Sequence, residues 1–198
     1  MATQALFIIF ALALAVQRLL ELRLSRRNEA RILAAGGREH APGQFRLMKV
    51  LHTSWFAAMA AEVTLLERPF IPLLAALALA VFLIGQVLRY AAIRTLDWRW
   101  TVRILTLSDA PPIETGIYRY IRHPNYLGVI LEVAAAPLLH TAYLTSIVFT
   151  LANAGVLIAR IRTEERALNA HNAYDRVFKD RPRFVPFRSR SGESARGS

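Results

Sequence analysis

A stretch without a single charged side chain, residues 69–88, decides the class of fold. A helix needs about 20 mostly apolar residues to cross a bilayer, so this stretch predicts a transmembrane helix, which we extend to 93. Comparable segments cover residues 2–22, 50–66, 125–139 and 142–159. We therefore expect an all-α integral membrane protein with five spans, the last two forming a tight hairpin broken by Pro137 and by His140-Thr141.

The composition combines two properties that soluble proteins rarely share. Hydrophobic residues make up 55% of the 198 residues, yet the formal net charge is +11 at pH 7. Disordered basic chains are not this apolar, whereas apolar spans alternating with basic ends give this combination. The chain contains no cysteine, which excludes a disulfide scaffold, a thiolate metal site and a cysteine nucleophile.

The basic residues lie on one side of the predicted spans. Segments 23–49, 94–123 and 160–198 hold seven, five and ten of the 25 Lys and Arg residues, and the loop between spans two and three holds only Arg68. Since basic loops stay in the cytosol, we expect the N-terminus outside and the C-terminus in the cytosol. A cleaved signal peptide is not expected, because its positive charges would precede the apolar run.

We expect one domain over residues 1–187. The run 181–188 is rich in arginine, proline and phenylalanine, which predicts an extended strap at the membrane interface. Residues 188–198 are expected to form a disordered tail.

Ionisable side chains within the predicted spans are costly unless they are paired or functional. Arg18 and Glu21 lie three residues apart and are expected to pair with each other. Four others have no obvious partner nearby in the sequence: His52, Glu62, Arg89 and Glu132. Together they predict a polar interior in a small helical bundle.

One segment whose side chains could form a binding or catalytic site precedes the fourth span. It runs Arg122-His123-Pro124-Asn125-Tyr126-Leu127-Gly128. Pro124 disfavours helical geometry at His123 and suits the first turn of a helix. His123 is therefore expected at a helix N-terminus, where N–H groups attract an anion. With Arg122 beside it and the aromatic rings of Tyr118 and Tyr126 around it, this loop could hold a small carboxylate.

A second segment, residues 160–168, follows the fifth span. Arg160 and Glu164 are four residues apart and share a helix face, so the simplest interpretation is a surface ion pair of about 0.3–0.5 kcal/mol. The order of Arg before Glu is the weaker one, however, and the segment emerges directly from the membrane. Glu164 and Glu165 would together suit a cationic ligand.

Combined, the two segments offer partners for the carboxylate and the ammonium of one zwitterion above an apolar bundle. S-adenosylmethionine has such an amino-acid end, and tyrosine faces attract its sulfonium. Transfer of its methyl group to a lipophilic acceptor is the chemistry that these parts suggest. No cluster of metal ligands is evident, and the reaction requires none.

Both segments resemble a known family. Tyr118 and the Arg122–Gly128 run, followed after a helical hairpin by Arg160, Glu164-Glu165 and Leu168, are similar to the isoprenylcysteine carboxyl methyltransferase family over about residues 85–187. The N-terminal Arg18, Glu21, Ser25-Arg26-Arg27-Asn28 and His52-Thr53-Ser54-Trp55, with Trp98-Arg99-Trp100-Thr101, look like a bacterial branch that methylates long-chain alkylpyrones or alkylresorcinols.

The resemblance implies a set of roles. S-adenosylmethionine would contact six residues: Tyr118, His123, Pro124, Asn125, Tyr126 and Glu164. Arg160 would face the acceptor oxygen, and a tunnel within the membrane would receive the lipid acceptor. The bacterial likeness also implies the bacterial cytoplasmic membrane as the location.

The mechanism expected is direct methyl transfer to an acidic oxygen, which needs in-line positioning and exclusion of water. Arg160 could orient a carboxylate or an enolate. A resorcinol hydroxyl has a phenol-like pKa of about 10 and needs help from His52, Glu62 or a water.

Three other functions stay open. One is carboxyl methylation of a prenylcysteine. Another is N-methylation of a phospholipid or other amine, an acceptor that offers Arg160 no anionic oxygen to bind. The third is a non-catalytic adaptor whose basic face binds anionic lipid. A nucleic-acid role is not expected, since topology explains the arginines. The sequence gives no oligomeric state.

Overall fold

Five long helices make up most of the protein in the computed structural model, which describes residues 2–108, 110–171 and 174–184. The long helices are α1 (Ala2–Ala34), α2 (Pro42–Leu65), α3 (Pro72–Leu96), α4 (Pro124–Leu138) and α5 (Tyr143–His171). The shorter elements are β1 (Arg38–His40), η1 (Asp97–Arg99), β2 (Ile104–Thr106), η2 (Gly116–Arg119) and α6 (Tyr174–Phe178). The all-α fold class predicted from the sequence is confirmed. The predicted tail, 188–198, lies outside the described residues.

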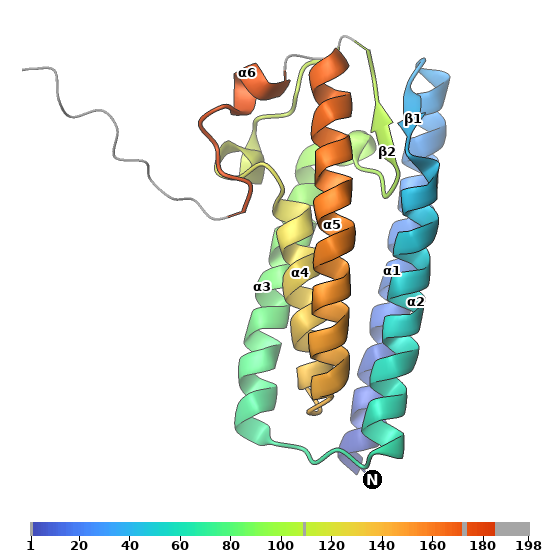
Figure 1. Cartoon of the computed structure of the whole chain (residues 1–198), viewed down its shortest axis with the longest axis vertical. Coiled ribbons are helices and arrows are strands. Elements are labelled where there is room, and N and C mark those ends of the chain that lie inside the picture. The colour runs from blue at the N-terminus through green and yellow to red at the C-terminus, as the bar shows by residue number, and fades with distance from the viewer. Residues whose placement is uncertain (1, 109, 172–173, 185–198) are drawn as a thin grey trace, which may run out of the picture.

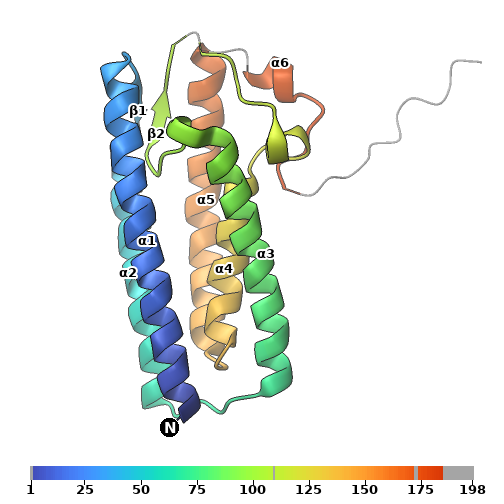
Figure 2. The ribbon, with the colours of Figure 1, turned by 180° about the vertical axis from the view of Figure 1, so that it is seen from behind.

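The bundle has two unlike ends (Figures 1 and 2). α1 and α2 run side by side, and α4 lies between α3 and α5. The N-terminus and the short α2–α3 and α4–α5 connections lie at one end, whereas β1, β2 and α6 lie at the other. The longer α1–α2 and α3–α4 connections are therefore gathered at a single end, together with the basic helix ends beside them.

Proline begins three of the long helices. Pro42, Pro72 and Pro124 each occupy the first turn, where proline's fixed φ fits and its missing N–H costs nothing. His123 precedes α4 with the non-helical angles φ −127° and ψ 58°, as the sequence predicts. The predicted hairpin is also present, because α4 ends at Leu138, directly after Pro137, and α5 begins at Tyr143.

Several helices continue beyond their predicted spans. α1 runs to Ala34 and α5 to His171, because polar helix-forming residues extend both beyond their apolar segments. Of the described helices, three are long and apolar enough to cross a membrane: Ala2–Ala34, Pro72–Arg99 and Tyr143–Ala170. α4 has only 15 residues, about 22 Å at 1.5 Å per residue, which is short for a bilayer core of about 30 Å. The five-span count stays a prediction.

Glycines allow α3 and α4 to approach closely. A Cβ on Gly85 would lie 2.9 Å from the carbonyl oxygen of Gly128, and a Cβ on Gly128 would lie 2.7 Å from that of Gly85. Gly128, in the histidine segment, therefore serves helix packing. On the outside of α1, leucine, isoleucine and valine side chains are exposed, as expected of a surface that faces lipid: Leu6, Ile9, Leu12, Val16 and Leu19.

The charged residues inside the bundle pair across helices. Arg18 contacts Glu21 at 2.6 Å and Glu132 at 3.0 Å. Arg89 pairs with Glu21 and lies 3.4 Å from Glu132. Two arginines and two glutamates thus compensate one another between α1, α3 and α4, which satisfies charges that are costly in this environment. We call these four residues the buried quartet.

Glu62 has a separate structural role. Its carboxylate accepts hydrogen bonds from the backbone N–H groups of Leu144 at 3.1 Å and Thr145 at 2.7 Å, and pairs with Arg68 at 2.8 Å. It therefore caps the first turn of α5, where unpaired N–H groups favour an anion.

Candidate active site

A cavity of about 520 Å³ runs from the basic end into the bundle. Tyr118, Leu168 and Tyr174 line it near α6, while Leu14, Trp55, Phe56 and Val133 line it between α1, α2 and α4. The buried quartet borders the cavity as well. A cavity of this size suits a small ligand, and its wall changes from polar to apolar along its length.

The histidine segment is hydrogen-bonded to a short segment near the C-terminus. Residues 181–184, which we call the C-terminal strap, run beside it: the N–H of Arg122 donates to the carbonyl of Pro182 at 3.0 Å, and the N–H of His123 donates to that of Arg183 at 3.1 Å. The strap thus occupies the N–H of His123, one of the donors at the helix N-terminus that the sequence predicts to attract an anion. In the first turn of α4, the N–H groups of Asn125 and Tyr126 are the ones without an intrahelical acceptor.

The His123 ring faces a carboxylate. Its Nε2 lies 3.0 Å from Oε1 of Glu165, and the ring is buried. Arg183 contacts the same carboxylate through Nε at 2.9 Å and Nη2 at 2.6 Å. Glu165 therefore joins the histidine segment, α5 and the strap, a role that its place beside Glu164 in the sequence did not reveal.

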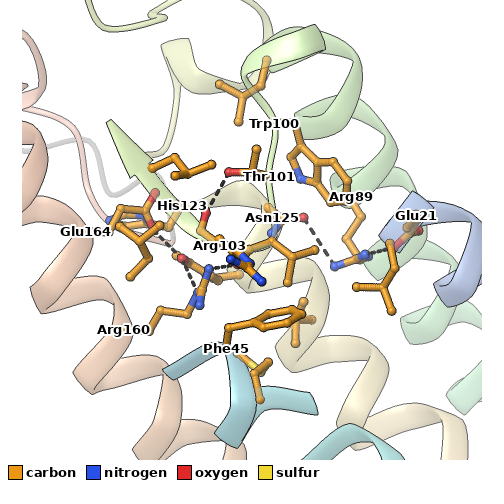
Figure 3. A pocket seen from close by; sticks show the side chains of 18 of the residues that line it. Glu21, Phe45, Arg89, Trp100, Thr101, Arg103, His123, Asn125, Arg160 and Glu164 are labelled. Atoms are coloured by element: carbon orange, nitrogen blue, oxygen red, sulfur yellow. Dashed lines mark hydrogen bonds and ion pairs between the residues drawn. The ribbon is translucent and has the colours of Figure 1, made fainter. Parts of the chain in front are cut away.

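Tyr126 joins the two sequence segments. Its hydroxyl donates to the Glu164 carboxylate and accepts a hydrogen bond from Nε of Arg160 at 2.9 Å. Arg160 also donates through Nη2 to the backbone carbonyl of Val102. Arg160 is only 4% exposed, so the structure excludes the solvent-exposed ion pair that was the simplest interpretation. Figure 3 shows Arg160 and Glu164 on the same side of the cavity.

Asn125 connects this site to the buried quartet. Its Oδ1 accepts a hydrogen bond from Nη1 of Arg89 at 3.4 Å, and Arg89 in turn binds Glu21 (Figure 3). Because Asn125 and Tyr126 are neighbours in the sequence, the polar groups from Glu164 to Glu21 line adjoining parts of the cavity wall.

Tyr118 lies in η2 and packs against Ala92, Tyr174 and Phe178. Its carbonyl accepts a hydrogen bond from Nη1 of Arg181 at 3.0 Å, so the strap also holds this turn. Burial raises the pKa of the Tyr118 hydroxyl well above its ordinary value of 10.0. The phenol therefore stays protonated and presents an aromatic face and a neutral hydroxyl to the cavity.

Six of the seven residues singled out in the sequence line this one cavity: Tyr118, His123, Asn125, Tyr126, Arg160 and Glu164. Pro124 is fully buried and is not among the lining residues. Its visible role is to begin α4 and to set the direction of His123.

Comparison with known proteins identifies the family of this chain. A Bacillus subtilis protein named YpbQ is 34% identical over 159 residues, which cover 80% of this chain and 94% of YpbQ. A Haemophilus influenzae protein is 28% identical, over 82% of this chain and 94% of its own length. The pattern of the isoprenylcysteine carboxyl methyltransferase (ICMT) family matches residues 76–170. The chain belongs to the ICMT family.

A solved structure supports the same fold. The eukaryotic intramembrane Ras methyltransferase ICMT superposes with a TM-score of 0.58 at 24% identity. The match covers 76% of this chain and 54% of that one, so this chain spans about half the length of the solved protein. The expectations of an integral membrane protein and of a methyltransferase family are confirmed.

The ICMT match covers α3 to α5, whereas α1 and α2 lie outside it and provide part of the site. Asn28 donates through Nδ2 to the carbonyl of Trp100 at 2.8 Å, and the Ser25 hydroxyl accepts the N–H of Val102 at 2.8 Å. These two residues fix the 97–103 loop, whose Val102 carbonyl holds Arg160. Both motifs, residues 25–28 and 98–101, were evident in the sequence, but the contact between them was not.

The pairing of β1 with β2 was also not predicted from the sequence. Arg38 to His40 pair antiparallel with Thr106 to Ile104, which ties the α1–α2 loop to the wall of the cavity. Strands of three residues give too short a pattern for recognition in a sequence.

Proposed function

We propose that this ICMT-family protein transfers a methyl group from S-adenosylmethionine to an acidic oxygen of a lipophilic acceptor, of the long-chain alkylpyrone or alkylresorcinol class. The observation that carries the proposal is the single cavity in which the Arg160–Tyr126–Glu164 hydrogen bonds adjoin an apolar interior. A reactive head group and a long hydrocarbon tail require this combination of walls.

The residues present fit the cofactor. The Glu164 carboxylate would bind its ammonium group, and the first-turn N–H groups of Asn125 and Tyr126 would bind its carboxylate. The rings of Tyr118 and Tyr126 would face the sulfonium. One donor favours a ligand too: the indole Nε1 of Trp100, in the cavity wall, is buried without a hydrogen-bond partner among the described residues. When bound, S-adenosylmethionine supplies an electrophilic methyl group.

Arg160 would orient the acceptor. Two of its three nitrogens are used by Tyr126 and Val102, and Nη1 has no hydrogen bond among the described residues. That nitrogen can donate to an acceptor oxygen and lower the cost of its negative charge as the methyl group approaches. The low exposure of Arg160 keeps water from competing for this contact.

The acceptor tail would extend toward Leu14, Trp55 and Phe56. Burial of each methylene there stabilises the complex by about 0.8 kcal/mol. We place the cofactor end of the cavity in the cytosol and the N-terminus outside, because the positive-inside distribution requires it. By analogy with the bacterial relatives, we propose the bacterial cytoplasmic membrane as the location.

A second acceptor class has support of its own. Carboxyl methylation, named in the description of the family, would use Arg160 in the same way, because a carboxylate is a planar oxyanion. An amine acceptor is disfavoured, since a buried guanidinium beside the reacting atom repels a cation. A non-catalytic adaptor would have no use for a cavity bordered by both motifs.

The test is methyl transfer by purified protein in detergent with labelled S-adenosylmethionine. Three acceptors with the same alkyl chain should be compared, carrying a hydroxypyrone or resorcinol, a carboxylate, or an amine. Product on the pyrone or resorcinol supports the proposal. Product on the amine alone, or no product with any acceptor, would contradict it. Mass spectrometry of lipid extracts from cells with and without the gene would identify the natural acceptor.

A further inference from the structure

His52 occupies a part of the cavity that the proposed roles do not use. It lies on α2 and lines the cavity one turn before Phe56, which belongs to the apolar end. Its Nδ1 lies 2.9 Å from the carbonyl oxygen of Met48. Because a carbonyl oxygen only accepts, Nδ1 carries the proton, and the neutral ring presents a lone pair on Nε2. Nε2 has no hydrogen bond among the described residues.

The other carboxylates and imidazoles in the cavity wall each have a side-chain partner. Glu21 and Glu132 are shared between the two arginines of the buried quartet. Glu164 accepts from Tyr126, and His123 faces Glu165. Glu62, the other candidate base from the sequence, caps α5 and does not line the cavity. Among the carboxylates and imidazoles that line the described cavity, the others each have a charged or side-chain hydrogen-bond partner, whereas His52 bonds only to a backbone carbonyl.

His52 shares the cavity with the two arginines of the buried quartet, Arg18 and Arg89, each of which binds Glu21. The part of α2 that carries His52 packs beside the site, because Met48, whose carbonyl binds the His52 ring, contacts the hydrophobic cluster that contains Tyr126. An acceptor head group there would meet Arg160 from α5 and His52 from α2.

We propose that His52 is the general base for a hydroxyl acceptor, and that this protein methylates a phenol or enol that must lose a proton. The inference rests on the function proposed above and narrows its acceptor class. The acceptor oxygen forms a bond to the sulfonium methyl carbon, and the carbon–sulfur bond breaks with its electron pair staying on sulfur. The hydroxyl proton moves to Nε2 of His52 and is later released to water. A carboxylate acceptor is already ionised at neutral pH, so its methylation needs no general base.

The test compares His52→Gln with His140→Gln in the purified full-length protein. His140 is the histidine control, because its ring is buried, makes a single hydrogen bond among the described residues, to the Thr3 hydroxyl, and does not line the cavity. Two acceptors with the same chain should be used, one a phenol and the other a carboxylic acid. Binding of labelled S-adenosylmethionine and of the phenol should be measured beside the rates.

We expect His52→Gln to slow transfer to the phenol by about 10²–10⁴-fold, the usual contribution of a general base, and transfer to the carboxylate by less than about threefold. S-adenosylmethionine binding should be unchanged. The wild-type rate with the phenol should rise with pH to a plateau. The rate of the variant should show no such plateau, because it follows the ionisation of the phenol itself. His140→Gln should retain both rates.

Each contrary outcome has its own meaning. Equal losses with both acceptors would show a structural role and overturn the inference. An unchanged rate with the phenol would also overturn it, while leaving the proposed function intact. A wild-type protein that methylates neither acceptor would refute the proposed function itself.

Discussion

The Nε of Arg160 donates a 2.9 Å hydrogen bond to the hydroxyl of Tyr126, which brings two distant parts of the chain into one site. Tyr126 comes from the first turn of α4, and Arg160 from the second half of α5. The hydroxyl also donates to Glu164. It therefore separates a cation from an anion that a helix would otherwise pair directly, and leaves both available to ligands of opposite charge.

Replacing Arg160 by alanine should lower the methyl-transfer rate at least about 100-fold, because a buried oxyanion contact contributes about 2.7–4 kcal/mol. The rate should be measured with saturating S-adenosylmethionine. Arg162→Ala is the matched control, since Arg162 lies on the same helix and is exposed. Equal rates in the two variants would remove Arg160 from the site.

Tyr126→Phe should leave the bundle folded and lower kcat/KM about 30-fold. Without the hydroxyl, Arg160 and Glu164 are free to pair with each other, and one hydrogen bond of about 1 kcal/mol is lost on each side. The loss should appear in the KM for S-adenosylmethionine as well as in kcat. A variant with wild-type kinetics would show that the bridge has no part in binding.

Glu165→Gln should loosen the C-terminal strap, because it weakens the contacts that Glu165 makes with Arg183 and His123. The Arg183 side chain is 55% exposed, so solvent screening limits the effect to about five- to tenfold faster trypsin cleavage after Lys179. Mass spectrometry of the fragments checks this. Glu164 lies one residue away and is not bonded to the strap, so trypsin should cleave the Glu164→Gln variant at the wild-type rate.

Glu132→Ala should destabilise the bundle by about 3–5 kcal/mol, since it leaves Arg18 and Arg89 with Glu21 as their shared partner in the buried quartet. The midpoint of thermal unfolding in detergent measures the loss. Glu114→Ala, which removes a surface pair with Arg181, should cost no more than about 1 kcal/mol. Equal midpoints would mean that the quartet does not stabilise the fold.

Local patterns in the sequence predicted the helices and the start of α4. Predominantly apolar runs predicted the helical regions, and Pro124 predicted the geometry of His123, because both depend on neighbouring residues alone. Helix ends were predicted less well: α1 continues to Ala34, since polar residues can extend a helix beyond the segment whose hydropathy marks it.

Contacts between distant segments could not be predicted in the same way. The three-residue spacing predicted Glu21 as the partner of Arg18, but no spacing indicated that Glu132 and Arg89 complete the quartet. The bond between the strap and His123 and the one between Asn28 and Trp100 are also long-range. Such contacts depend on how helices pack, which the periodicity of a single helix does not encode.

Equilibrium binding of labelled S-adenosylmethionine to the purified protein and to its Glu164→Ala variant tests the central claim most directly. If the histidine segment and the acidic end of α5 enclose one methyl-donor site, the wild-type protein binds at about one molecule per chain. Glu164→Ala should then weaken binding at least about tenfold, the loss of one charge-assisted contact. Absence of saturable binding by the wild type, or equal affinity in the variant, would contradict the account.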